Sequence, residues 1–97
     1  MAESVTIARP YAEAVFRTAK EQGALAGWSA RLTRLAAIAQ DGEMAEIVGN
    51  PKLSVEQVSQ LFISLADDND AVLGNFIRVL AENRRLALLP EISRLFE

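Results

Sequence analysis

The sequence predicts an all-α protein, a compact bundle of about six helices. Apolar residues recur three and four positions apart over most of the 97 residues, a spacing that places them on one face of a helix. No segment alternates apolar and polar residues for long enough to indicate a strand. Glycines, prolines and pairs such as Asp-Gly and Asn-Pro divide the chain into segments of helical length.

The first helix is expected to start between Ser4 and Ile7 and to stop at Gly23. A helix interior disfavours proline, so Pro10 is expected close to the opening turn, where few backbone N–H groups need partners. Arg9 then lies near the positive end of the helix dipole. This position predicts a compensating carboxylate, either Glu13 on the same helix or Glu82 further along the chain.

This first helix carries two apolar columns, although a core-facing surface helix needs only one. Small residues dominate both columns, which allows another helix to approach closely. The column expected to face the core is Ala8, Ala12, Phe16 and Ala19. The neighbouring column is Ile7, Tyr11, Ala14, Val15 and Thr18.

The second helix is expected from about Leu25 to Gln40, with one apolar stripe that includes Trp28 and a polar back. Large aromatic side chains dominate small cores, so Trp28 is expected to be buried. After Asp-Gly, a short helical segment follows and stops at Asn50, because the residue before a proline is pushed out of helical geometry.

A capping box opens the fourth helix, since Ser54 is followed three residues later by Gln57. This helix is expected to run to about Ala66, with Val55, Val58, Leu61, Phe62 and Leu65 facing inward. The turn at residues 67–70 can cap the next helix. The spacing of its carboxylates does not fit a calcium-binding loop, because apolar residues fall where the fifth ligand and the glycine belong.

The run from Asp70 to Leu89 also carries two apolar columns. One is Leu73, Ile77, Leu80 and Arg84, and the adjacent one is Val72, Phe76, Val79 and Asn83. Such a helix either packs on two sides or offers one side to a partner. The last segment, residues 87–97, is expected to form a short helix with Pro90 in its first turn.

Composition narrows the function classes. The formal net charge of −3, spread over the whole length, does not favour nucleic-acid binding. The chain has no cysteine and no histidine, which excludes thiolate and imidazole chemistry. We therefore expect no catalytic residue, no metal site and no cofactor. A membrane span and a signal peptide are not expected either, because no long apolar run is present.

Two stretches, ARPYAEAVFRTAKEQG at 8–23 and NFIRVLAENRRLALLPEI at 75–92, support a family resemblance. The sequence resembles the N-terminal domain of the delta subunit of F-type ATP synthases, called the oligomycin-sensitivity-conferring protein in mitochondria. That resemblance implies a six-helix bundle on top of the catalytic head. It also implies a groove between the first and fifth helices that binds the amphipathic N-terminal helix of an alpha subunit.

The resemblance accounts for the second apolar column on each of these two helices. The expected partner-binding residues are Ile7, Tyr11, Ala14, Val15, Thr18, Phe76, Val79 and Asn83. The role implied is a non-catalytic stator adaptor that anchors the catalytic head to the peripheral stalk. The alternative is a self-associating module whose extra columns close a homodimer.

The chain is expected to form a single helical domain over residues 1–97 and to be a monomer in isolation. Members of the family continue into a C-terminal part that binds stalk subunit b, so contact with subunit b is not expected of these residues. The expected location is peripheral, on the cytoplasmic face of the bacterial inner membrane or its organellar equivalent.

Overall fold

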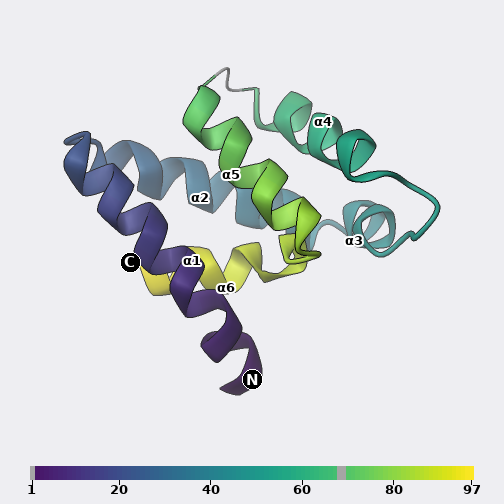
Figure 1. The fold of residues 1–97 in the computed structure, drawn as a ribbon, viewed down its shortest axis with the longest axis horizontal. Coiled ribbons are helices and arrows are strands. Elements are labelled where there is room, and N and C mark those ends of the chain that lie inside the picture. The colour runs from purple at the N-terminus through teal and green to yellow at the C-terminus, as the bar shows by residue number, and fades with distance from the viewer. Residues whose placement is uncertain (1, 68–69) are drawn as a thin grey trace. The chain divides into compact units, whose positions relative to one another are not determined.

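In a computed structural model, which describes residues 2–67 and 70–97, the chain is helical and the described residues contain no strand (Figure 1). The predicted all-α class is therefore confirmed. The α-helices of the described residues are α1 (Ala2–Glu21), α2 (Leu25–Gln40), α3 (Gly42–Val48), α4 (Val55–Ala66), α5 (Ala71–Glu82) and α6 (Leu89–Phe96), with a short 3-10 helix at Leu86–Leu88.

The helices divide into two compact units. Unit 1 comprises residues 1–37 and 88–97, and unit 2 comprises residues 38–87, so the boundary falls within α2. In unit 1, α1 packs against α6 although the two helices come from opposite ends of the sequence (Figure 1). In unit 2, α4 packs against α5.

Helix α1 begins earlier than the sequence suggested. It starts at Ala2 instead of between Ser4 and Ile7, so Pro10 lies inside the helix. A missing N–H removes only one hydrogen bond, which a helix of 20 residues tolerates when packing holds the rest. The helix ends at Glu21, and Gly23, the predicted stop signal, follows with a φ of 64° that suits glycine.

The buried stripe of α1 differs from the predicted core column by one residue. Ala8, Ala12 and Ala19 are buried as expected, but Val15 completes the stripe and Phe16 is 42% exposed. Positions 8, 12, 15 and 19 follow one line along the helix, whereas position 16 lies roughly 70° around it. Phe16 instead contacts Phe96 of α6 edge to face, with ring centroids 5.6 Å apart.

Trp28 of α2 is buried in unit 1, as predicted. Its Nε1 donates a hydrogen bond to Oε1 of Gln22 at 3.2 Å. The guanidinium of Arg31 lies over the ring, 5.2 Å from its centroid. The hydroxyl of Ser29 donates to the carboxylate of Glu97 at 2.6 Å, which ties the end of the chain to α2.

Local capping signals explain where the helices of unit 2 begin. The carboxylate of Asp41 accepts from the backbone N–H groups at the start of α3. The predicted capping box of α4 is confirmed: Ser54 Oγ accepts from the Gln57 N–H at 3.1 Å, and Gln57 Oε1 accepts from the Ser54 N–H at 2.8 Å. The carboxylate of Asp70 caps α5 by accepting from the backbone N–H groups of Val72 and Leu73. Asp68 and Asn69 of the predicted turn lie outside the described residues.

The inward face of α4 was only partly predicted. Val58 and Phe62 are buried, but Val55 and Leu65 are 39% and 49% exposed. Ser59 and Ala66 lie on the buried face with Val58 and Phe62. Val55 is the first residue of the helix, and Leu65 lies to one side of the buried face. The small residues Ser59 and Ala66 on that face allow a neighbouring helix to approach closely.

The apolar run that begins at Asp70 is not one helix. Helix α5 ends at Glu82, and Arg84 adopts a left-handed conformation with φ of 58°. Leu73, Ile77 and Leu80 are buried as predicted, whereas Arg84 lies beyond the helix and cannot extend their column. Pro90 lies in the first turn of α6, as predicted.

Candidate functional site

Helix α1 presents a second apolar face beside its buried stripe. Ile7 is 37% exposed, Tyr11 and Thr18 are half-buried, and Ala14 is exposed. These positions repeat at intervals of four, three and four residues, as the buried stripe does. The Thr18 hydroxyl donates to the carbonyl oxygen of Ala14 at 3.1 Å, so its polar group is satisfied within the helix.

Val15 occupies a different position from the other predicted residues of α1. It is 5% exposed and belongs to the buried stripe. Val15 is a neighbour of Tyr11 and Thr18 on the helix surface. Its side chain, however, packs against the rest of the protein instead of facing solvent.

Helix α5 presents a comparable second face in unit 2. Val79 is 37% exposed, Phe76 is half-buried, and Asn83 is exposed at the C-terminal cap. Val72 is 40% exposed and shares this face, although it is not among the predicted partner-binding residues. The sequence does place Val72 in the same apolar column as Val79, and this spacing could have added it to the predicted set.

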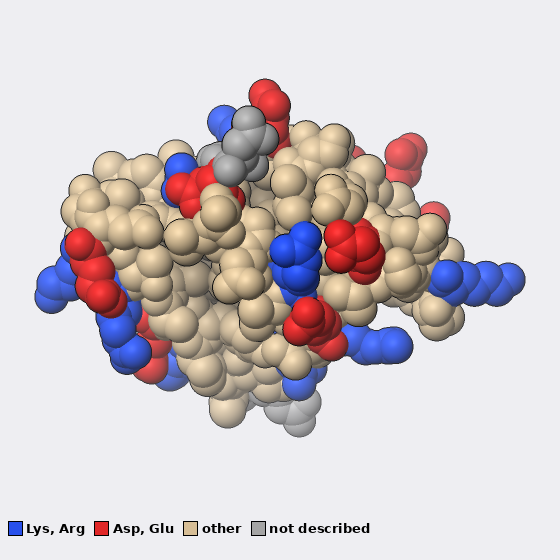
Figure 2. Space-filling view, turned by 45° about the horizontal axis from the view of Figure 1, so that its top comes forward, with Lys and Arg blue, Asp and Glu red and all other residues tan. Residues whose placement is uncertain are grey.

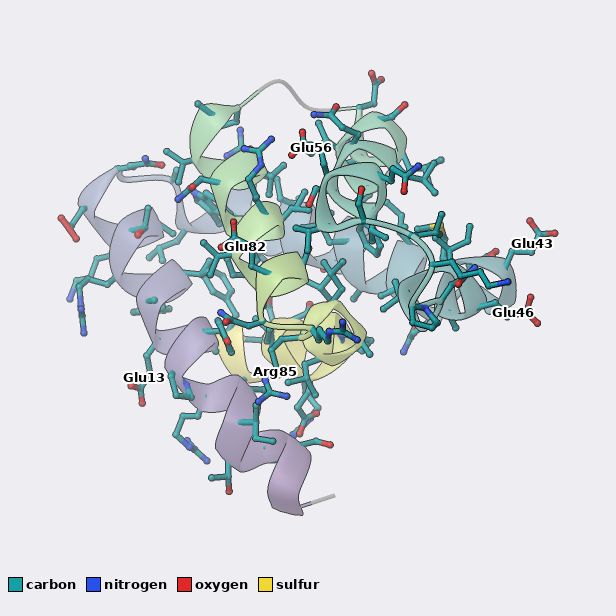
Figure 3. The ribbon with its side chains drawn as sticks, turned by 45° about the vertical axis from the view of Figure 1, so that its right-hand side comes forward. Glu13, Glu43, Glu46, Glu56, Glu82 and Arg85 are labelled. Atoms are coloured by element: carbon teal, nitrogen blue, oxygen red, sulfur yellow. The ribbon has the colours of Figure 1, made fainter. Side chains whose placement is uncertain are left out.

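Charges around the α5 face are partly paired. Arg78 of α5 and Glu56 of α4 form an ion pair at 3.6 Å, with side chains 39% and 64% exposed. Figure 3 shows Glu56 on α4 and Glu82 on α5. An ion pair exposed to water contributes little to stability.

In unit 1, Arg94 of α6 holds the carboxylate of Glu91 through two hydrogen bonds of 2.9 and 2.6 Å. The hydrogen bonds and the positive charge lower the pKa of Glu91 and raise that of Arg94. The carboxylate is therefore ionised at neutral pH, and the pair is lost only as pH falls through this lowered pKa.

Within 2–67 and 70–97, no group of three or more acidic side chains could hold a metal ion. In the same part of the chain, no helix has the length and apolar character needed to cross a membrane. On the face drawn in Figure 2, acidic and basic side chains lie near one another, with uncharged surface between them.

Comparisons with known proteins identify the family. The family model described as ATP synthase delta (OSCP) subunit matches residues 7–97. A protein named ATP synthase subunit delta from Aromatoleum aromaticum is 55% identical over 97 residues, which are 99% of this chain and 54% of that protein. Proteins of the same name from Dechloromonas aromatica and Hahella chejuensis are 51% and 49% identical, each over 100% of this chain and 55% of the relative.

The chain thus spans about half the length of the curated relatives it matches. The match covers both sequence patterns on which the resemblance was based, at 8–23 and 75–92. By its sequence and by these matches, the chain belongs to the ATP synthase delta (OSCP) subunit family.

Proposed function

We propose that this chain is a non-catalytic adaptor in the stator of F-type ATP synthase and that it binds the amphipathic N-terminal helix of an alpha subunit. The observation that carries the proposal is a second, partly exposed apolar face on both α1 and α5. Membership of the family supplies the assembly in which such faces would act.

The proposed recognition is that of an amphipathic helix laid against apolar faces. A short helix offers anchors at intervals of three and four residues, which match the repeat on α1 and on α5. The proposal requires both faces to contact the same partner helix. A stable contact of this kind buries on the order of 1,200 Å² in total.

Tyr11 and Val79 are the proposed central anchors. Affinity in such interfaces comes from a few well-packed residues, and tyrosine is a favoured type because its ring is large and its hydroxyl finds a polar rim. Ile7, Ala14, Thr18, Phe76 and Asn83 complete the proposed contact set, with Val15 supporting the α1 face from within.

In this function the chain does mechanical work only. By gripping the catalytic head it would help the stator resist the torque of the rotor, without a catalytic residue or a cofactor. Its place would be peripheral, at the cytoplasmic face of the inner membrane in a bacterium. Contact with stalk subunit b is proposed for the remaining part of the longer relatives and not for these residues.

Calorimetric titration with a synthetic alpha N-terminal peptide tests the proposal. Tyr11→Ala is expected to weaken binding about tenfold or more, because a buried aromatic anchor is lost. Val79→Ala is expected to weaken it about fivefold, since two methyl groups leave the contact. Circular dichroism should show both variants folded, because neither side chain is fully buried.

Val55→Ala provides a matched control. Val55 is 39% exposed, close to the 37% of Val79, but lies at the start of α4, away from both faces in sequence and on another helix. Its replacement should leave the affinity for the alpha peptide unchanged. Wild-type affinity in both Tyr11→Ala and Val79→Ala would defeat the proposal.

A further inference from the structure

Basic residues of unit 1 fall into two groups. Arg31 lies over the Trp28 ring, Arg94 is bonded to Glu91, and Arg34 also has an interaction partner. The other three are Arg9, Arg17 and Lys20, all on α1, and none has an ion pair or a side-chain hydrogen bond with the described residues.

Arg9 departs from its expected pairing. The sequence predicted that Glu13 or Glu82 compensates it, but the structure contains no such ion pair among the described residues. Because α1 begins at Ala2, Arg9 lies in the third turn and not the first. The unfavourable dipole effect that called for a carboxylate fades beyond the first turn.

The three unpaired cations line the same surface hollow. It lies between α1 and α6 within unit 1 and has a volume of about 580 Å³. Its apolar part is formed by Phe16, Leu95 and Phe96, of which Phe16 is 42% exposed. The exposed Phe16 ring and three cations that form no ion pair with the described residues therefore border one hollow.

Two carboxylates, Glu13 and Glu97, also line the hollow, so its side chains carry three positive and two negative charges. Glu97 accepts the hydrogen bond from Ser29. Glu13 forms no ion pair among the described residues, and Figure 3 shows it extending outward from α1. The hollow therefore keeps an excess of positive charge in a chain whose formal net charge is −3.

Charge is also divided unevenly between the two units. The sequence of unit 1 contains six basic and five acidic residues, whereas that of unit 2 contains four basic and eight acidic residues. An acidic partner is attracted to unit 1 and repelled by unit 2. Half of the basic residues of unit 1 line the hollow, so within unit 1 an acidic partner is expected to bind there.

We propose that the hollow between α1 and α6 is a docking site for an acidic amphipathic peptide segment of a partner protein. One apolar side chain of the segment lies against Phe16 and Phe96, and its carboxylates face Arg9, Arg17 and Lys20. Guanidinium groups suit this task because they bind carboxylates through two parallel hydrogen bonds. An anionic membrane is a poorer fit, since a flat surface does not enter a hollow.

This site is separate from the face proposed for the alpha subunit. Tyr11 and Phe16 are about 140° apart around α1, at roughly 100° per residue. The buried stripe of Ala8, Ala12, Val15 and Ala19 lies between them. One helix can therefore take part in two contacts, and each can be tested without the other.

The test uses the full chain and a fluorescent helical peptide of leucine and glutamate, with binding followed by anisotropy. The triple variant Arg9→Gln, Arg17→Gln, Lys20→Gln is expected to weaken binding at least about tenfold. Phe16→Ala is expected to weaken it about fivefold. Added salt should reduce wild-type affinity and have little effect on the triple variant.

The matched control is Lys52→Gln, Arg84→Gln, Arg85→Gln, which removes the same charge from unit 2. It should bind the acidic peptide within about twofold of wild type. Tyr11→Ala should also leave this affinity unchanged, which separates the site from the proposed alpha contact. Because Phe16→Ala also removes the contact with Phe96, thermal unfolding is recorded for every variant, and the glutamine variants keep the aromatic pair intact.

Three results would overturn the proposal. Absence of binding to the acidic peptide removes the site. Equal binding of a leucine–lysine peptide with the same apolar spacing shows that charge plays no part. Binding to vesicles containing phosphatidylserine, without binding to the acidic peptide, shows a lipid surface instead of a protein partner.

Discussion

At the scale of one residue, Ser59 is a polar side chain buried at a position where its small size suits the packing but its hydroxyl finds no partner among the described residues. Ser59 of α4 is completely buried, and its Oγ has no hydrogen-bond partner among the described residues. A polar group removed from water without a partner costs about 1–3 kcal/mol. Its small size suits the buried face of α4, which is an advantage that alanine would share.

Ser59→Ala is therefore expected to raise the free energy of unfolding, by about 1 kcal/mol, since it removes the unsatisfied hydroxyl. Urea unfolding followed by circular dichroism measures the change. Ser64→Ala on the same helix is the control, because Ser64 is exposed and the change in helix propensity is the same. A loss of stability in Ser59→Ala, or a gain no larger than that of Ser64→Ala, would contradict this account.

The exposure of single side chains decides which residues are free to contact a partner. Val15 and Val79 are both valines in second apolar columns, yet one is 5% and the other 37% exposed. Phe16 was assigned to the core although Arg9, Glu13 and Lys20 share its side of α1. Those neighbouring charges were the available signal that Phe16 would face solvent.

At the scale of elements, α1 and α5 end with the same backbone motif but different residues. In α1, the N–H of Ala24 donates to the Ala19 carbonyl and Gly23 is left-handed. In α5, the N–H of Arg85 donates to the Leu80 carbonyl at 2.7 Å, and Arg84 takes the left-handed position with φ of 58°. Glycine usually occupies this position because a Cβ is strained there.

Arg84→Gly is expected to stabilise the chain by about 0.5–1 kcal/mol, because relief of strain exceeds the added entropy of the unfolded state. Arg85→Gly, one residue further along, is the control and should destabilise, since Arg85 does not have a positive φ. Both are measured by urea unfolding. Equal losses in the two variants would show that the left-handed position of Arg84 carries no strain.

Capping separates what local sequence can predict from what it cannot. The box formed by Ser54 and Gln57 lies within four consecutive residues, so its hydrogen bonds were predictable from spacing. The end of α5 carries no glycine or proline signal. It follows from the burial of Leu86 and Leu89, which requires the chain to change direction after Glu82.

At the scale of the whole molecule, partly exposed apolar residues raise the question of self-association. They include Ile7 on α1 and Val72 and Val79 on α5. In the proposed function these faces bind an alpha subunit, and the net charge of −3 opposes pairing of two copies. The homodimer considered from the sequence would instead bury the same faces against a second copy.

Sedimentation over a range of concentrations distinguishes the two. The chain is expected to remain a monomer at micromolar concentration and to form a one-to-one complex when the alpha peptide is added. A dimer that forms without peptide, and that Val79→Ala dissociates while Val55→Ala does not, would favour the homodimer.

The sequence by itself determined the helical class, most helix boundaries, the capping box of α4 and the family, because these depend on spacing and on residues close together along the chain. Only the tertiary structure decided that Val15 is buried, that Phe16 and three unpaired cations border a hollow, and that α1 packs against α6. Burial of an individual side chain depends on what the rest of the chain places over it. Periodicity identifies the faces of a helix but does not say which neighbour covers each one.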